Sequence, residues 1–172
     1  MTDDNYLCRA SKILLIGAGP STAELIREIS VFSDAIVAAD GGFRAAENAG
    51  AEVILVVGDM DSQHDLPTDQ AVAHIADQET TDFQKCLAVC DADVFLGVGF
   101  LGGRLDHQLA AFSAILNEPR PVVLVDEAQL VFVVPPEFSM DLEAETPVGF
   151  YPMVPIQASL RGVRWPLSNA AM

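Results

Sequence analysis

Short apolar runs alternate with amphipathic segments from Lys12 onward. The runs are rich in β-branched residues, as in strands buried on both faces of a parallel sheet, whereas the segments between them have helical spacing. The predicted strands span 13–16, 35–39, 53–57, 71–75, 94–98 and 122–125, and the predicted helices span 21–30, 42–48, 81–89 and 105–117. Strands that alternate with helices in this way predict an α/β fold with a parallel sheet covered by helices.

The pattern changes near Gln129. Residues 130–134 have the pattern of one more strand, and prolines then interrupt short segments that have no helical period. This spacing is typical of antiparallel β structure. We therefore expect an α/β domain at 1–127 and a small antiparallel β domain at 128–172. A domain of about 45 residues is marginal for an independent core, so the second domain should rest on another surface.

Composition excludes several classes of protein. The chain has 9 Lys and Arg against 25 Asp and Glu, which gives a net charge of −16. Phosphate backbones and anionic lipids repel such a chain, so we expect no nucleic-acid or membrane partner. The apolar runs are far shorter than the ~18–20 residues that span a bilayer. The acidic start Met1–Asn5 has no apolar segment behind it, which predicts a cytoplasmic protein without a secretory signal.

The cysteines are Cys8, Cys86 and Cys90. Three thiols cannot all pair, and in the cytoplasm they stay reduced. Cys86 and Cys90 are four residues apart, on one face of a predicted helix, but no third Cys or His lies near them in the sequence. We expect buried thiols here, because a zinc site needs more ligands.

Polar residues and glycines gather where the predicted strands end. In an open parallel sheet, ligands bind beyond these carboxyl ends, where helix N-termini point their N–H groups outward. The segments concerned are 17–22, 40–42, 58–62, 80–82, 99–107 and 126–127. Helix capping explains a single Asp or Ser, but not acids that follow several strands on one rim. We therefore expect a shared binding site at this edge.

The acids at this edge predict the ligand. The carboxylates of Asp40, Asp59, Asp61 and Asp82 are hard oxygen ligands that suit Mg²⁺ held together with substrate phosphates. The most informative pair is Asp59 and Asp61, spaced by one residue directly after an apolar strand. Glycines let backbone N–H groups approach an anion, and Arg104 offers a planar fork for a phosphate. Together these residues predict a Mg-nucleotide site.

Some of these motifs also have simpler interpretations. Gly17-Ala18-Gly19 can be only a tight turn, and Thr80-Thr81-Asp82 only a helix cap. His107 fits a capping or core residue better than a base, since phosphoryl transfer depends more on positioning and charge than on imidazole. Trp165 suits either the core of the β unit or a stacking surface for an aromatic ligand.

Five motifs occur in order along the chain. They are Asp40-Gly41-Gly42, Gly58-Asp59-Met60-Asp61-Ser62, Thr81-Asp82-Phe83, Gly102-Gly103-Arg104-Leu105-Asp106-His107 and Gly162-Val163-Arg164-Trp165-Pro166-Leu167. In this combination they are specific, and the chain resembles the thiamine pyrophosphokinase family over nearly its whole length. The resemblance implies an α/β catalytic domain, a β-sandwich domain, a homodimer, and Mg-dependent transfer of diphosphate from ATP to the hydroxyl of thiamine, with release of AMP.

The resemblance also implies roles for individual residues. Catalytic roles fall to Asp59, Asp61, Asp82 and Arg104, and the Mg²⁺ ligands would be Asp40, Asp59 and Asp61. The implied nucleotide-binding residues are Asp40, Gly41, Gly42, Ser62, Thr81, Gly102, Gly103, Asp106 and His107. Thiamine would lie at the dimer interface against Trp165, Ser168 and Asn169. Because thiamine is a cationic aromatic, an indole face and an acidic rim would both attract it.

The chain departs from the family pattern at three places. Gln78 and Glu79 stand where the family usually has Lys-Asp, which removes a positive charge near the phosphates. Ala111 stands where an Asn often follows. Leu167 directly precedes Ser168, although a loop normally separates the two motifs. Either the β domain is truncated or stretches of it are omitted from the sequence, and we favour omission.

Other functions stay open at this stage. Gly17 and Gly19, followed by Asp40, mimic the spacing of an NAD-dependent oxidoreductase, although Thr22 stands where the third glycine belongs. A non-catalytic binder of thiamine or nucleotide fits the substitutions at Gln78 and Glu79. A diphosphokinase acting on a pterin alcohol would share the nucleotide chemistry but leaves Trp165 without a role.

Overall fold

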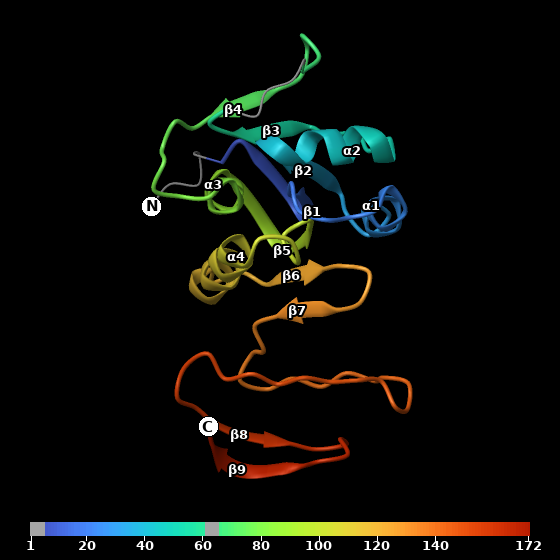
Figure 1. The fold of residues 1–172 in the computed structure, drawn as a ribbon, viewed down its shortest axis with the longest axis vertical. Coiled ribbons are helices and arrows are strands. Elements are labelled where there is room, and N and C mark those ends of the chain that lie inside the picture. Colours follow the sequence, from blue (N-terminus) through green and yellow to red (C-terminus); the bar gives the residue numbers. More distant parts are fainter. Residues whose placement is uncertain (1–5, 61–65) are drawn as a thin grey trace. The chain divides into compact units, whose positions relative to one another are not determined.

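The computed structural model describes residues 6–60 and 66–172 (Figure 1). Two of the predicted site residues, Asp61 and Ser62, lie outside the described residues. The chain forms two compact units, Met1–Val134 and Pro135–Met172. Each unit is described by itself below.

The first unit alternates strands and helices, as the sequence predicts. Its elements are β1 (Cys8–Ile16), α1 (Ala23–Ser30), β2 (Ala35–Ala39), the 3₁₀ turn η1 (Asp40–Gly42), α2 (Phe43–Ala49), β3 (Leu55–Gly58), β4 (Val72–His74), α3 (Asp82–Val89), β5 (Cys90–Val98), α4 (Leu105–Asn117), β6 (Val122–Val125) and β7 (Leu130–Phe132). The predicted α/β class is confirmed.

The strands of this unit form one sheet in the order β4-β3-β2-β1-β5-β6-β7. Neighbouring strands from β4 to β6 are parallel, and β7 pairs antiparallel with β6. The direction of winding reverses at β1, because β2 lies on one side of it and β5 on the other. Such a reversal opens a crevice at the carboxyl ends of the two central strands, which is where ligands bind in open α/β sheets.

The first unit ends later than the sequence pattern places its boundary. The carboxylate of Asp126 accepts hydrogen bonds from the backbone N–H groups of Ala128 and Gln129, which turns the chain back so that Leu130 pairs with Val125. The edge strand β7 therefore extends the first sheet, and the unit runs to Val134 instead of residue 127.

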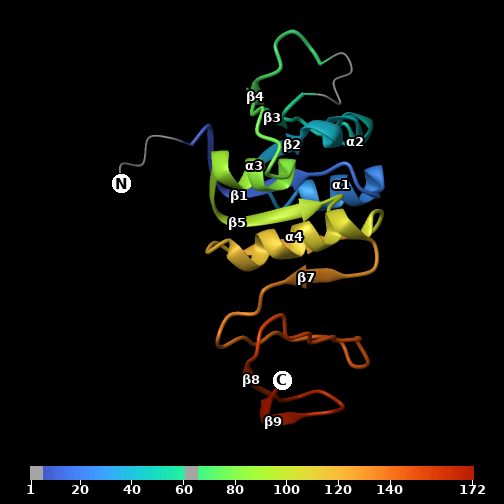
Figure 2. The same cartoon turned by 60° about the vertical axis from the view of Figure 1, so that its left-hand side comes forward.

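Helices cover both faces of the sheet (Figures 1 and 2). Ile13 and Leu15 of β1 point into a core shared with α3 and α4, whereas Leu14 and Ile16 point into a core shared with α1 and α2. All four side chains are fully buried. This explains the continuous apolar runs in the sequence, because a strand buried on both faces needs apolar residues at every position.

Two strands are longer than the sequence pattern predicts. β1 begins at Cys8 and β5 at Cys90, and these two residues are direct neighbours across the parallel pair. Cys90 therefore begins a strand and does not share a helix face with Cys86. All three cysteines are buried and free.

The second unit, which the structure describes in full, contains one antiparallel pair of strands. These are β8 (Gln157–Leu160) and β9 (Leu167–Ala171). Leu167 and Ser168 follow each other within β9. The predicted antiparallel β character of this part is confirmed.

Candidate active site

Acidic side chains from two distant segments meet at the end of β3. A methyl group on Gly58 would lie 2.6 Å from Cβ of Asp40 and 3.2 Å from Oδ1 of Asp82, and Asp59 is the next residue in the chain. Asp40 follows β2, the parallel neighbour of β3, so Asp40 and Asp59 both lie at the carboxyl edge of the sheet. The structure thus brings Asp40 and Asp82 together beside Gly58, with Asp59 next in the chain and close enough to Lys85 to raise its pKa, whereas Asp61 lies outside the described residues.

Asp40 is buried, with 6% of its surface exposed. It opens the 3₁₀ turn that also holds Gly41 and Gly42. A side chain on Gly42 would lie 2.1 Å from the carbonyl oxygen of Ile16, so only glycine fits there. Gly42 therefore lets the turn pack closely against β1, and this packing fixes the backbone position of Asp40.

Asp59 is contacted by residues of β4 and of the segment that follows β4. The side-chain amide of Gln78 donates to Oδ2 of Asp59 at 2.5 Å, and a ring nitrogen of His74 lies 3.1 Å from the carbonyl oxygen of Asp59. The family resemblance drawn from the motifs places a lysine at the position of Gln78. In this chain a neutral donor takes the place of that cation beside the carboxylate.

Asp82 begins α3 behind a capping box. The Thr81 hydroxyl accepts from the N–H of Gln84 at 3.3 Å, and the Gln84 side chain accepts from the N–H of Thr81 at 3.0 Å. Such a box satisfies helix N–H groups that have no partner within the helix. Thr81 therefore fixes the start of the helix, and with it the direction of the Asp82 side chain.

Lys85 is a site residue that the sequence analysis does not predict. Its side chain is 4% exposed, and its Nζ lies 3.0 Å from Oδ1 of Asp82. Burial alone would lower the pKa of Lys85, but the hydrogen bond and charge of Asp82, with the charges of Asp59 and Asp77, raise it above its usual value. Lys85 is therefore a buried cation beside the acids. In the sequence, the only sign of it is the spacing of three between Asp82 and Lys85, which is equally typical of a surface ion pair.

The loop after β5 is tied to this site by aromatic packing. The rings of Phe83 and Phe100 lie with centroids 4.3 Å apart. A side chain on Gly17 would lie 2.6 Å from the Phe100 ring and 2.5 Å from the carbonyl oxygen of Gly99, so the loop after β1 closes tightly on the same ring. The glycines here serve close approach of backbone, in line with the simpler interpretation of Gly17 and Gly19 as a tight turn.

Arg104, Asp106 and His107 lie exposed at the start of α4. The guanidinium of Arg104 donates to both carboxylate oxygens of Asp106, at 3.0 and 2.5 Å. This hydrogen bonding lowers the pKa of Asp106 below its usual value. Gly102 and Gly103, just before them, adopt the left-handed backbone conformation that favours glycine. The ion pair of Arg104 is with Asp106 and not with the acids around Gly58.

The predicted thiamine-binding residues lie in the second unit. Trp165 is 77% exposed, and the guanidinium of Arg164 lies 5.0 Å from the centre of its ring. Ser168 and Asn169 belong to β9, and the N–H of Asn169 donates to the Ser159 hydroxyl at 2.9 Å. The exposed indole agrees with a stacking surface better than with a core residue.

The N-terminus of α1 is hydrogen-bonded by a side chain from a distant part of the chain. The N–H of Thr22 donates to a carboxylate oxygen of Glu127 at 2.9 Å, and the Thr22 hydroxyl accepts from the N–H of Leu25. In a dinucleotide-binding fold this helix N-terminus holds the pyrophosphate. An acidic side chain at that place speaks against the NAD-dependent alternative.

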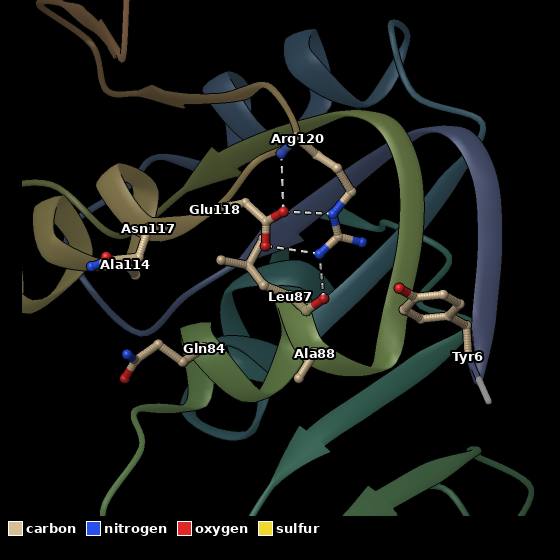
Figure 3. Close-up of a pocket in the computed structure, with 8 residues that line it drawn as sticks. All are labelled: Tyr6, Gln84, Leu87, Ala88, Ala114, Asn117, Glu118 and Arg120. Atoms are coloured by element: carbon tan, nitrogen blue, oxygen red, sulfur yellow. Dashed lines mark hydrogen bonds and ion pairs between the residues drawn. The ribbon is translucent and has the colours of Figure 1, made fainter. Parts of the chain in front are cut away.

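A pocket of about 240 Å³ lies at the far end of α3 (Figure 3). Arg120 forms part of the pocket wall. It donates to both carboxylate oxygens of Glu118 and to the carbonyl oxygens of Leu87 and Cys90. The pocket contains none of the predicted site residues, and it is smaller than the ~300–1,000 Å³ of typical ligand pockets. We assign it a structural role, because Arg120 ties the segment before β6 to the junction of α3 and β5.

Two features are absent from the described residues, 6–60 and 66–172. No three side chains of His, Cys, Asp or Glu in these ranges are arranged to hold a metal ion by themselves. Within the same ranges, no helix combines the length and the apolar character that crossing a membrane requires.

Comparison with known proteins decides the family. The family described as thiamin pyrophosphokinase, catalytic domain, matches residues 27–124, more than half of the chain and all of the segment that carries the acids. The chain belongs to the thiamin pyrophosphokinase family. The resemblance drawn from the sequence motifs is therefore confirmed. A search of curated proteins gave no significant match.

Solved structures agree with this fold. A protein from Lactobacillus plantarum is 24% identical with a TM-score of 0.71, over 95% of this chain and 84% of that one. A thiamin pyrophosphokinase family protein from Enterococcus faecalis is 21% identical with a TM-score of 0.66, over 94% and 84%. Thiamin pyrophosphokinase from Geobacillus thermodenitrificans is 25% identical with a TM-score of 0.52, over 67% of this chain and 59% of that one.

Proposed function

We propose that this chain is a thiamine diphosphokinase, which transfers diphosphate from Mg-ATP to the hydroxyl of thiamine and releases AMP. The observation that carries the proposal is the approach of Asp40 and Asp82 beside Gly58, directly before Asp59, within the segment that matches the family. Carboxylates crowded at one sheet edge repel each other, and a divalent cation with a triphosphate relieves that repulsion.

The acids suit Mg²⁺ even though they form no complete cage. Magnesium sites usually use one or two carboxylates, with waters and substrate phosphates as the other ligands. Asp40 and Asp59, with Asp61 from the same motif, would hold the ion, and Asp82 would lie beside them. The chemistry that the bound ion supplies is neutralisation of charge on the phosphate oxygens.

In this reaction the main task of the protein is to position the two substrates. The thiamine oxygen forms a bond to the β-phosphorus of ATP, the bond from that phosphorus to the oxygen of the α-phosphate breaks, and AMP leaves with that oxygen. A carboxylate of the site accepts the hydroxyl proton. Arg104 is exposed at the start of α4, and its planar fork suits phosphate oxygens. No covalent enzyme intermediate is needed.

The second unit supplies the thiamine site in this proposal. The exposed indole of Trp165 suits the cationic aromatic rings of thiamine, and Ser168 and Asn169 offer polar groups on β9. By the family resemblance, thiamine binds at the interface of a homodimer in the cytoplasm. Trp165→Ala should therefore raise the KM for thiamine with little change in the KM for ATP.

AMP release tests the proposed function. The purified chain is incubated with Mg-ATP and thiamine, and in parallel with Mg-ATP and a pterin alcohol. We expect AMP and thiamine diphosphate only with thiamine, and loss of both products in Asp61→Asn and Asp82→Asn. AMP formed only with the pterin alcohol would show that the site acts on an acceptor other than thiamine. An Asp61→Asn protein with full activity would refute the role of that residue.

One observation favours a second function, non-catalytic binding of thiamine or nucleotide. Gln78 gives Asp59 a neutral partner where the family usually has a cation. If thiamine and Mg-ATP raise the melting temperature of the protein but no AMP forms, the chain is a binder and the proposed enzyme activity is wrong.

A further inference from the structure

The position of Lys85 is energetically unfavourable when only its burial and its place in the helix are considered. A buried ammonium loses its hydration, and a cation near a helix N-terminus opposes the helix dipole. Lys85 has both disadvantages, because it is 4% exposed and lies in the first turns of the eight-residue helix α3. The other lysine in the sequence, Lys12, is exposed on β1. A cation retained at such a cost needs a compensating partner.

The compensation comes from the acids of the site. Nζ of Lys85 donates to Oδ1 of Asp82 at 3.0 Å, and this same oxygen lies 3.2 Å from where a side chain on Gly58 would begin. Asp59 and Asp77 add attraction that, with Asp82, raises the pKa of Lys85 in spite of its burial. Lys85 is therefore charged at neutral pH, and it fixes the Asp82 oxygen that faces the end of β3.

We propose that Lys85 is a positioning residue for the diphosphate transfer, which acts through Asp82. It holds the carboxylate of Asp82 against the end of β3 and offsets part of the repulsion among the acids, so that the site is formed before cation and nucleotide bind. Its burial keeps Nζ away from the substrate, so it is not a catalytic residue itself. The inference rests on the proposed function, but its effect on cation binding can be measured separately.

The main experiment compares Lys85→Met with Lys12→Met, a matched loss of one lysine charge at an exposed position. Asp82 lies beside the proposed cation ligands, and groups in the outer shell of a metal site typically contribute 10–100-fold in metal affinity or activity. We expect Lys85→Met to lower kcat and to weaken binding of Mn²⁺, used as a spectroscopic probe for Mg²⁺, each by roughly 10-fold. The KM for thiamine should stay within about two-fold, and Lys85→Arg should recover part of both losses. Lys12→Met should behave as wild type.

A double variant tests whether Lys85 acts through Asp82. In the Asp82→Asn background, adding Lys85→Met should change Mn²⁺ affinity less than about two-fold, because the carboxylate that Lys85 positions is already gone. The double variant also carries no uncompensated buried charge, so it covers the case in which Lys85→Met alone fails to fold.

The outcomes separate this inference from the proposed function. Wild-type kcat and Mn²⁺ affinity in Lys85→Met would overturn the role of Lys85, and so would a further loss of five-fold or more in the double variant relative to Asp82→Asn. If the wild-type protein makes no AMP from thiamine, the proposed function fails. The Mn²⁺ titrations then still decide whether Lys85 positions Asp82.

Discussion

The ring of Phe100 packs against the ring of Phe83, with the two centroids 4.3 Å apart. This contact joins the helix that begins at Asp82 to the loop that leads to Arg104, two motifs separated in the sequence. The ring of Phe100 also occupies the space left open by the missing side chains of Gly17 and Gly97. One aromatic side chain therefore sets the relative positions of three segments at the carboxyl edge of the sheet.

Phe100→Ala should destabilise the fold and lower activity. Removing the half-buried ring takes away its contact with Phe83, and we expect a cost of about 2 kcal/mol in the free energy of unfolding. We expect a lower melting temperature and a lower kcat, because the loop to Arg104 loses its anchor. Phe32→Ala is the control, since Phe32 is 62% exposed and its loss should cost less than about 0.5 kcal/mol. Equal melting temperatures for the two variants would contradict the anchoring role.

Gly58→Ala tests the crowding of the acids directly. The added methyl would lie 2.6 Å from Cβ of Asp40 and 3.2 Å from Oδ1 of Asp82, so the two carboxylates must move apart. We expect loss of most activity and weaker Mn²⁺ binding. Gly149→Ala is a matched control, because nothing lies within 4 Å of its added methyl. Full activity in Gly58→Ala would show that the reaction does not depend on this arrangement.

Gln78→Lys should supply the cation that the family resemblance places at this position. The side chain of Gln78 donates to Asp59, and it is exposed, so a lysine has room to make the same contact with a full charge. We expect the KM for ATP to fall several-fold, with a smaller change in kcat, because the added charge attracts the phosphates before the reaction. Initial rates at varied ATP measure this. A higher KM would mean that the lysine competes with the bound cation for Asp59.

Arg120→Met should lower stability without changing the chemistry. Arg120 donates to the carbonyl oxygens of Leu87 and Cys90 and to the carboxylate of Glu118, which loses the guanidinium in the variant and keeps the backbone N–H of residue 120 as a donor. We expect a loss of about 2–3 kcal/mol in the free energy of unfolding, measured with urea. Arg44→Met, at an exposed position, is the control. A large fall in kcat with unchanged stability would instead give the Arg120 pocket a role in the reaction.

The Glu118–Arg120 pair also predicts a pH dependence of stability. Burial alone would raise the pKa of Glu118, but hydrogen bonds from the side chain and the N–H of Arg120 lower it below its usual value. A carboxylate with a lowered pKa stabilises the fold above its unfolded pKa, near ~4.3, and loses this contribution as the pH falls through the folded value.

Wild type and Glu118→Gln should therefore differ most in unfolding free energy above about pH 5, and the difference should shrink below about pH 4. Urea unfolding across this range measures it. A difference that stays constant with pH would show that the pair contributes through packing and not through the charge of Glu118.

Several local elements follow from the sequence alone. The predicted strands 35–39 and 122–125 and the predicted helix 105–117 coincide with β2, β6 and α4. The helix predicted at 81–89 differs from α3 by one residue, since the cap residue Thr81 lies just outside. These elements depend on spacing, capping and proline placement within a few residues, and such signals are visible in the chain itself.

Other features depend on pairing between distant segments. β1 and β5 extend back to Cys8 and Cys90 because these residues pair with each other, although neither segment has a strong strand pattern there. The same holds for β7, which becomes part of the sheet through its pairing with β6. Local propensity does not contain this information, because each segment gains its backbone partners only from the other.

The sequence by itself determined the order of strands and helices and the motifs that end the strands, because residue spacing and composition act over short distances. Only the tertiary structure decided that Asp40 and Asp82 meet at Gly58, that Phe100 joins two of the motifs, and that Lys85 is buried beside an acid. The physical reason is that burial and contact depend on which strands become neighbours, and a change of environment turns an ordinary Asp–Lys spacing into an ion pair with a buried lysine.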